Sequence, residues 1–272
     1  MTAITVRSAF DGKTAYAVGV FCSFFFAYLT MADFSRREPS KAHHGASANL
    51  FYGIASAAFA LLSLGSAASF FASKRGSEKQ DVALLLILLN VFEGLSFYAL
   101  KNHLSPSVRD AMLPTPVELV RFMEFIHGPL CLMVVFSKIT QSQRDISLPT
   151  LSWIASISLG YMTMIYKPFA SVLLMVPAHF CTLYPTYALW EIFDDAIKSP
   201  NPPMSTKALS FLQKLTVIMW NLYTVIYMLQ LAKIISADMT EVLFSCASII
   251  NKGATTIAIL SNSINYLKAK AN

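Results

Sequence analysis

Eight apolar segments, each long enough to cross a bilayer, constrain this chain more than any other feature. A membrane-spanning helix needs about 20 predominantly apolar residues. Windows of that length predict spans at 13–31, 49–73, 81–101, 115–139, 149–166, 168–193, 207–234 and 240–267. With 55% hydrophobic and 13% charged residues, the chain is too apolar for a soluble domain. We therefore predict an all-α integral membrane protein.

The predicted spans divide the chain into two parts. Residues 1–48 would form one additional N-terminal transmembrane helix and its loop, and residues 49–272 a bundle of seven helices. The apolar run at 13–31 is too long for a signal peptide and is followed by a weak cleavage site. The remaining loops leave no room for a soluble catalytic domain, so no enzymatic activity is expected in this chain.

The charges indicate the partners and the orientation. The net charge is +6, but the basic residues are scattered over loops, which favours anionic lipid headgroups over nucleic acid. An even number of spans places both termini on one side of the bilayer, and most loop lysines and arginines predict that this side is cytoplasmic. The opposing residues, in the first loop, are Arg36, Arg37 and Lys41. All four cysteines fall inside predicted spans and are expected to be small buried hydrophobes, so no metal site is predicted.

Lys252 lies in the middle of the last predicted span, with more than ten span residues on each side. A lysine near the bilayer centre costs roughly 2.5–3.5 kcal/mol on insertion scales. Such a side chain is normally paired, exposed to water or chemically altered. A Schiff base with an aldehyde is one such alteration, and its protonated form needs one counter-charge.

Further ionisable residues occur within the predicted spans. Arg121, Glu124 and His127 recur every three residues of the fourth span and are therefore helix neighbours. A carboxylate there and a cation in the last span are natural partners across a bundle, either as a structural ion pair or as a functional site. Glu118, near a helix end, is expected to be solvated, and His179 would pack between helices or beside a ligand.

Aromatic residues line one face of the seventh predicted span. Trp220, Tyr223 and Tyr227 follow an i, i+3, i+7 pattern. Such a stripe serves ordinary packing or forms a flat wall for a conjugated apolar ligand.

Together these residues resemble the microbial-type (type I) rhodopsins over roughly residues 49 to 268. Arg121-Phe122-Met123-Glu124-Phe125 is similar to the Arg-aromatic-x-carboxylate-aromatic motif of the third family helix, and Pro129 follows it. Trp220-Asn221-Leu222-Tyr223 is similar to a motif of the sixth family helix, and Lys252 stands where the family carries its retinal-bearing lysine.

The resemblance implies a seven-helix bundle that binds all-trans-retinal covalently, as a protonated Schiff base on Lys252 with Glu124 as counterion. Light would isomerise the retinal and move the proton relative to Glu124, or onward to His127. The other residues that the resemblance assigns to the retinal site are Arg121, Phe125, His127, Gly128, Trp220, Tyr223, Tyr227 and Ser248.

The sequence departs from the family's proton pumps at two places. Ser248 stands one turn before the lysine, where pumps usually carry an Asp, which leaves Glu124 as the one obvious anion near the imine. The stretch 133–136 is wholly apolar where pumps usually place a cytoplasmic proton donor. Efficient pumping is therefore not expected. Glu93 falls near the level of the imine, either as part of a channel gate or as a protonated acid bonded to a helix neighbour.

The additional N-terminal helix is similar to that of rhodopsins linked to phosphodiesterase, cyclase or bestrophin-type modules. We therefore expect a photoreceptor that passes a conformational signal to a fused or separate effector on the cytoplasmic side. The family resemblance also implies a homo-oligomer. One alternative is a light-gated ion channel or weak ion transporter. A second is a heliorhodopsin-like photoreceptor, although spans two and three lack the histidines usual there. A third is a transporter in which Lys252 and Glu124 bind an ion or polar solute in the dark.

Overall fold

A computed structural model describes residues 44–109, 113, 116–165 and 168–262 of the chain. The predicted span 13–31 and the end of the last predicted span lie outside these residues. The described helices are α2 (Ala46–Ala72), α3 (Glu78–Lys101), α4 (Leu119–Thr140), α5 (Ser147–Ile165), α6 (Pro168–Lys198), α7 (Thr206–Leu231) and the continuous column α8 (Ala237–Ser248), η1 (Ile249–Gly253) and α9 (Ala254–Ser261).

The predicted helical membrane fold agrees with this description. Five of the described columns have both the length and the hydropathy of a membrane span, namely α2, α3, α4, α7 and α8–α9. The eight-helix arrangement is not confirmed, because seven columns are what the described residues form. The predicted start of the fourth span at residue 115 is wrong. Strands β1 (Ser107–Arg109) and β2 (Pro116–Glu118) pair antiparallel just before α4 begins.

Serine hydroxyls define where three of the helices begin. Ser77, Ser205 and Ser236 precede α3, α7 and α8, and each accepts a hydrogen bond from a backbone N–H of the first helical turn. An N-terminal turn has four unsatisfied N–H groups, and a serine cap satisfies one of them without changing the helix.

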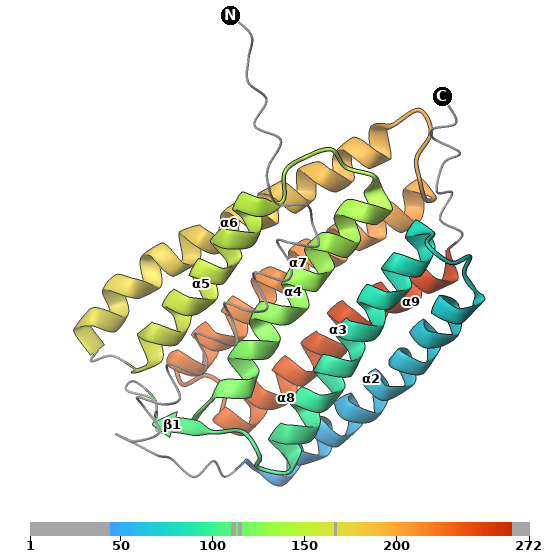
Figure 1. The fold of residues 1–272 in the computed structure, drawn as a ribbon. Coiled ribbons are helices and arrows are strands. Elements are labelled where there is room, and N and C mark those ends of the chain that lie inside the picture. Colours follow the sequence, from blue (N-terminus) through green and yellow to red (C-terminus); the bar gives the residue numbers. More distant parts are fainter. Residues whose placement is uncertain (1–43, 110–112, 114–115, 166–167, 263–272) are drawn as a thin grey trace, which may run out of the picture.

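The columns pack side by side as a bundle (Figure 1). We refer to its two ends as the Leu119 end, where α4 and α8 begin, and the Thr140 end, where α4 stops and α9 ends. In α4, 83% of the most apolar window is buried, compared with 17% in α2. Helix α4 is therefore the central element, and α2 is peripheral.

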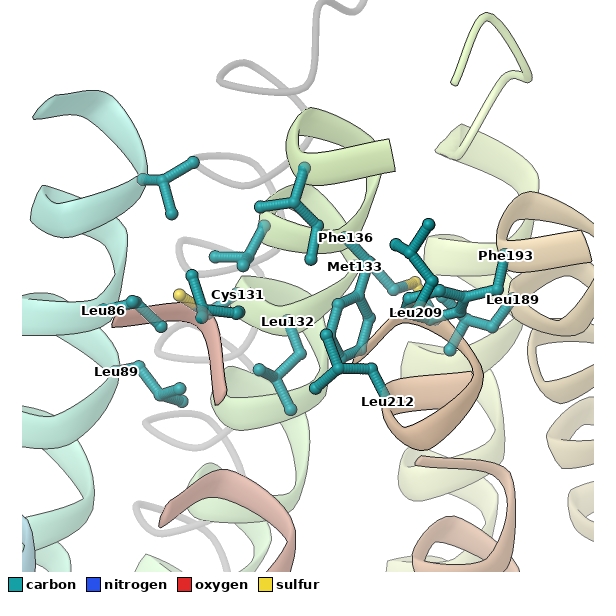
Figure 2. Close-up of a cluster of buried hydrophobic side chains, with 14 of the residues drawn as sticks. Leu86, Leu89, Cys131, Leu132, Met133, Phe136, Leu189, Phe193, Leu209 and Leu212 are labelled. Carbon is teal, nitrogen blue, oxygen red and sulfur yellow. The ribbon is translucent and has the colours of Figure 1, made fainter. Parts of the chain in front are cut away.

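The core of the bundle at its Thr140 end is apolar. Side chains from α3, α4, α6 and α7 meet there in one cluster (Figure 2). Its members Leu86, Cys131, Phe136, Phe193 and Leu212 have no measurable exposure. This cluster closes the bundle between its middle and its Thr140 end.

Candidate functional site

Lys252 lies in the widened helical turn η1, and its residue is 1% exposed. Single turns of π-helix inside α-helices are costly and occur frequently at functional sites. The Lys252 Nζ lies 2.7 Å from the Glu93 Oε2 and 3.1 Å from the Glu124 Oε1. Two carboxylates from two different helices, α3 and α4, therefore meet one buried amine.

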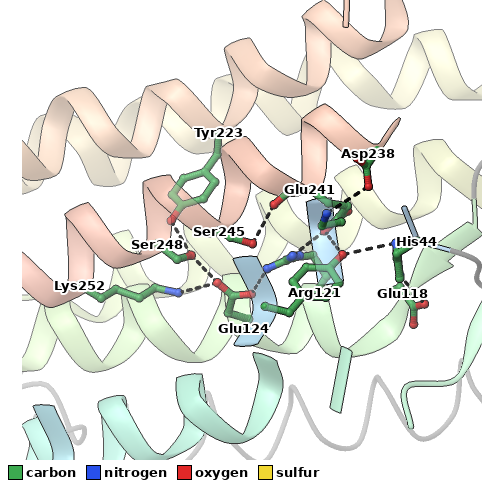
Figure 3. A network of polar contacts seen from close by, with 12 residues as sticks. His44, Glu118, Arg121, Glu124, Tyr223, Asp238, Glu241, Ser245, Ser248 and Lys252 are labelled. Atoms are coloured by element: carbon green, nitrogen blue, oxygen red, sulfur yellow. Dashed lines mark hydrogen bonds and ion pairs between the residues drawn. The ribbon is translucent and has the colours of Figure 1, made fainter. Parts of the chain in front are cut away.

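Glu124 is held by three donors (Figure 3). Besides Lys252, the Arg121 Nη1 donates to its Oε2 at 2.6 Å and the Ser248 Oγ donates to its Oε1 at 2.5 Å. The Ser248 hydroxyl also lies 2.9 Å from the Tyr223 hydroxyl. A buried carboxylate with this many donors is stabilised in its ionised form.

Glu93 was not assigned to the site from the sequence, and the expectation that Glu124 is the one anion near Lys252 is wrong. The Glu93 carboxyl group is fully buried and lies closer to the Lys252 Nζ than the Glu124 carboxyl group does. The signal in the sequence was a glutamate inside an apolar span. Because the segment between α3 and α4 is long, the sequence did not determine whether Glu93 lies at the same depth in the bundle as Lys252.

Gly128 permits this close approach. A Cβ atom at position 128 would lie 2.6 Å from the Lys252 Cε and 2.9 Å from the Glu93 Oε1. The absence of a side chain on α4 is therefore what leaves room for the lysine and its second carboxylate.

Arg121 extends the polar network toward the Leu119 end of the bundle. Its Nη2 lies 2.5 Å from the Glu241 Oε2, which also accepts from the Tyr52 hydroxyl at 2.8 Å. The guanidinium lies over the Tyr52 and Phe97 rings. Neither Glu241 nor Tyr52 was identified from the sequence, because each acts through Arg121 and carries no motif of its own.

Glu118 differs from its predicted solvated state. It is 4% exposed, and its Oε1 lies 3.1 Å from the His44 Nε2. Glu118 is the last residue of strand β2 and directly precedes α4, and its carboxyl group points inward. A position near a helix end did not reveal this burial.

A cavity of about 460 Å³ lies against Lys252, Asn251 and Arg121. It runs between α4, α5, α6 and α7, and its aromatic walls are formed by Phe122, Phe125, Trp153, Trp220, Tyr223, Tyr227 and Phe244. Five of these were predicted or named within motifs, whereas Trp153 and Phe244 were missed. The Trp153 side chain lies beside Trp220. Its ring lies 4.4 Å from the Trp220 ring, centroid to centroid, and both are nearly fully buried.

Two histidines are placed differently from one another. His127 is not among the residues that line this cavity, and its ring stacks on Phe92 at 4.0 Å. His179 does line the cavity, and its Nδ1 lies 2.9 Å from the backbone oxygen of Met175 on its own helix. His179 therefore lies beside the cavity and makes its hydrogen bond within α6.

The arrangement combines a buried primary amine, a largely apolar cavity and a fixed anion. An amine in such surroundings can bind an apolar carbonyl compound and hold a positive charge at its nitrogen.

Comparison with known proteins gives a consistent family. The bacteriorhodopsin-like proteins match residues 48–263 of the sequence. A search of curated proteins gave no match.

The fold is similar to that of several solved rhodopsins. The transmembrane domain of the Salpingoeca rosetta rhodopsin phosphodiesterase is 17% identical, with a TM-score of 0.73 over 92% of this chain and 94% of that domain. A light-driven proton pump from Leptosphaeria maculans is 12% identical, with a TM-score of 0.69 over 80% of this chain and 96% of the pump. Halorhodopsin, a light-driven chloride pump, is 12% identical, with a TM-score of 0.67 over 80% of this chain and 95% of that pump.

At such low sequence identities, the structural matches establish a shared fold alone. The family match, in addition, covers most of the described bundle. The chain belongs to the bacteriorhodopsin-like family and is a membrane protein of the rhodopsin type.

Proposed function

We propose that this protein is a photoreceptor that carries all-trans-retinal on Lys252 and uses Glu124 as the counterion. The observation that carries the proposal is a fully enclosed amine, paired with carboxylates, at the wall of an aromatic cavity. A lysine that served only as a structural ion pair would not require an apolar cavity beside it.

The residues of the site fit this cofactor. Binding sites for small molecules have volumes of about 300–1,000 Å³ and mostly apolar walls, and the cavity of about 460 Å³ has both properties. Phe125, Trp153 and Trp220 would hold the polyene. The Asn251 side chain also lines this cavity and has no hydrogen-bond partner within the described part of the chain, so its amide is available near the nitrogen. When bound, the cofactor absorbs visible light and isomerises, which supplies the free energy for a conformational change.

The charged residues around Lys252 hold and accept the proton of its nitrogen. Glu124 stabilises positive charge on the Nζ and is the acceptor to which a proton on that nitrogen can move. Once Glu124 is neutral, its ion pair with Arg121 weakens, and Arg121 shifts toward Glu241. This rearrangement of a buried pair is the step that would move α4 relative to α8.

A signalling role is favoured over efficient pumping. Met133, Val134, Val135 and Phe136, where pumps place a donor, are at most 3% exposed within apolar clusters. The match to the rhodopsin phosphodiesterase domain covers 92% of this chain, whereas the matches to the proton and chloride pumps cover 80%. This supports an effector, fused or separate, as the recipient of the signal. We further propose a helix at 13–31 and a cytoplasmic Thr140 end.

A light-gated channel is the second candidate, because a further polar group lies beyond Glu93 in the Thr140 half. The Asn90 amide lies 3.4 Å from the Ser66 hydroxyl and 3.3 Å from the Thr256 hydroxyl, so it links α2, α3 and α9. A channel would need this cluster to hydrate in the light.

The decisive experiment is a visible spectrum of the protein expressed with all-trans-retinal. We expect a visible absorption band that is abolished in Lys252→Ala and retained in Lys214→Ala, which removes an exposed lysine of α7. The absence of a band in folded wild-type protein with excess retinal would refute the photoreceptor. If the band is present, photocurrents in voltage-clamped cells separate the candidates, since a channel conducts in the light and a sensor does not.

A further inference from the structure

The proposed function gives a role to Glu124 but none to Glu93, although Glu93 lies closer to Lys252. Three groups that can carry a proton meet in one buried site, namely the Lys252 Nζ and the two carboxyl groups. Carboxylates that share one buried site do not readily ionise together, because like charges repel and burial penalises both. The distribution of protons over these three groups decides how the site works.

The charges of the network are balanced without Glu93. Arg121 and Lys252 supply two positive charges, and Glu124 and Glu241, both bonded to Arg121, supply two negative charges. The hydroxyls of Ser248, Tyr52 and Tyr223 act as neutral donors or acceptors. The His44–Glu118 pair contacts the network through the Tyr52 hydroxyl, away from Lys252. His127 is counted as neutral as well, because a third cation beside Lys252 and Arg121 would be repelled and its ring is stacked on Phe92. An ionised Glu93 would therefore add an unbalanced charge to a buried site.

The hydrogen bonds favour the same distribution. Glu124 receives three donors from three residues, whereas within the described residues Glu93 receives one, the Lys252 ammonium. A carboxylate with one donor is much less stabilised than one with three. Of the two acids, Glu93 is thus the one that retains its proton.

We propose that Glu93 is the internal proton store of this site. The inference rests on the proposed photoreceptor function and adds a second proton-exchanging carboxyl group to it. In the dark, the Nζ and Glu93 each carry a proton and Glu124 carries none. Light moves the Nζ proton to Glu124, Glu93 then gives its own proton to the Nζ, and the proton on Glu124 returns to Glu93.

This cycle conserves two protons over three groups and transports none across the membrane. It also replaces the donor that is lacking at 133–136, because reprotonation of the Nζ requires no path through the apolar cluster at the Thr140 end. Gly128 keeps Glu93 and the nitrogen in contact by leaving the intervening space open.

The dark state is tested first on the retinal-free protein, by infrared spectroscopy of the carboxylic acid C=O stretch in lipid nanodiscs. We expect wild type to show a buried acid band that is absent in Glu93→Gln. Glu93→Asp keeps an acid at this position and should shift the band without removing it, which controls for a folding defect in Glu93→Gln. Glu118→Gln removes a buried carboxyl group outside the site and should retain the band.

The transfer is tested on the retinal-loaded protein by flash spectroscopy. After the Nζ loses its proton, we expect its reprotonation to be slower in Glu93→Gln by on the order of 10²-fold, the usual contribution of a positioned acid. Glu93→Asp should restore part of the rate.

Three results would overturn the proton store. They are a wild-type acid band that persists in Glu93→Gln, no acid band at all in wild type, or reprotonation as fast in Glu93→Gln as in wild type. The photoreceptor itself fails separately, through the absence of a visible band in wild type, while the infrared measurement on retinal-free protein still reports where the proton lies.

Discussion

At the scale of single residues, the site depends on which side chains reach the Lys252 Nζ. Sequence spacing alone places Arg121 beside Glu124, since residues three apart are neighbours on a helix. The contacts of Lys252 with Glu93 and Glu124 join residues that lie far apart in the chain, from three different helices. Such contacts depend on how each helix is rotated about its axis. At Gly128 the space between α4 and Lys252 is too small for an added side chain.

Gly128→Ala should therefore disturb the site. The added Cβ would lie 2.6 Å from the Lys252 Cε, so the lysine or Glu93 must move within a packed interior. We expect a loss of about 1–3 kcal/mol in the free energy of unfolding, as for other overpacked cores, together with weaker retinal uptake. Thermal unfolding in one detergent and the yield of the visible band measure these effects.

Gly160→Ala is the matched control, because a Cβ at position 160 of α5 meets nothing within 4 Å. Alanine is the better helix former by up to about 1 kcal/mol, so this variant should be as stable as wild type or more so. Equal free energies of unfolding for the two alanine variants would contradict the tight contact at Gly128.

At the scale of helices, α5 compensates for prolines in its neighbours. Pro129 in α4 and Pro185 in α6 have no backbone N–H, so the carbonyl oxygens four residues earlier, of Phe125 and Cys181, lose their helical donor. The Trp153 Nε1 donates to the Phe125 oxygen at 2.7 Å, and the Ser152 hydroxyl donates to the Cys181 oxygen at 2.9 Å. Two adjacent residues of α5 thereby donate hydrogen bonds to the carbonyl oxygens that the prolines leave without a donor in α4 and α6. These two bonds hold α5 against both helices.

Ser152→Ala should lower the free energy of unfolding by about 1–3 kcal/mol, because it leaves the Cys181 carbonyl oxygen without a donor. Pro185→Ala supplies a backbone N–H to that oxygen. In the double variant we therefore expect the serine substitution to cost less, with a coupling of about 0.5–3 kcal/mol in a double-mutant cycle. Strictly additive effects would show that the serine hydroxyl does not compensate for the proline.

At the scale of the whole molecule, buried charge is concentrated near the middle and the Leu119 end, while the Thr140 end carries exposed ion pairs. Arg121 is 4% exposed between Glu124 and Glu241. Arg144, in contrast, makes its ion pairs with Glu191 and Asp195 at the surface. The two arginines have similar numbers of acidic partners and very different surroundings.

Arg121→Gln and Arg144→Gln should therefore differ strongly in stability. Removal of one member of a buried charge pair typically costs about 3–5 kcal/mol, because its partners remain buried and unpaired. We expect a loss of that size for Arg121→Gln and little measurable change for Arg144→Gln, since exposed pairs are screened by solvent. Thermal unfolding of both variants in the same nanodiscs tests this, and a comparable loss for the two would refute the role assigned to burial.

Local sequence patterns predicted much of this molecule. Each described span was found within about five residues of its helix, because length and hydropathy are properties of one segment. The start of α4 was misplaced, since the predicted span included Pro116–Glu118, which pairs with Ser107–Arg109 as a strand. Glu118 was misjudged for the same reason, because its burial against His44 comes from that strand and from the start of α2.

The sequence by itself determined the apolar helices, the neighbouring Arg121 and Glu124, and the presence of a lysine that a bilayer tolerates only with a partner. These are consequences of composition and helical periodicity, which act within one segment. Only the tertiary structure decided that Glu93 joins Glu124 at Lys252, that Trp153 closes the cavity and that α5 satisfies two proline-interrupted helices. The physical reason is that each of these contacts joins different helices, and their relative rotation and depth are set by the packing of all side chains together.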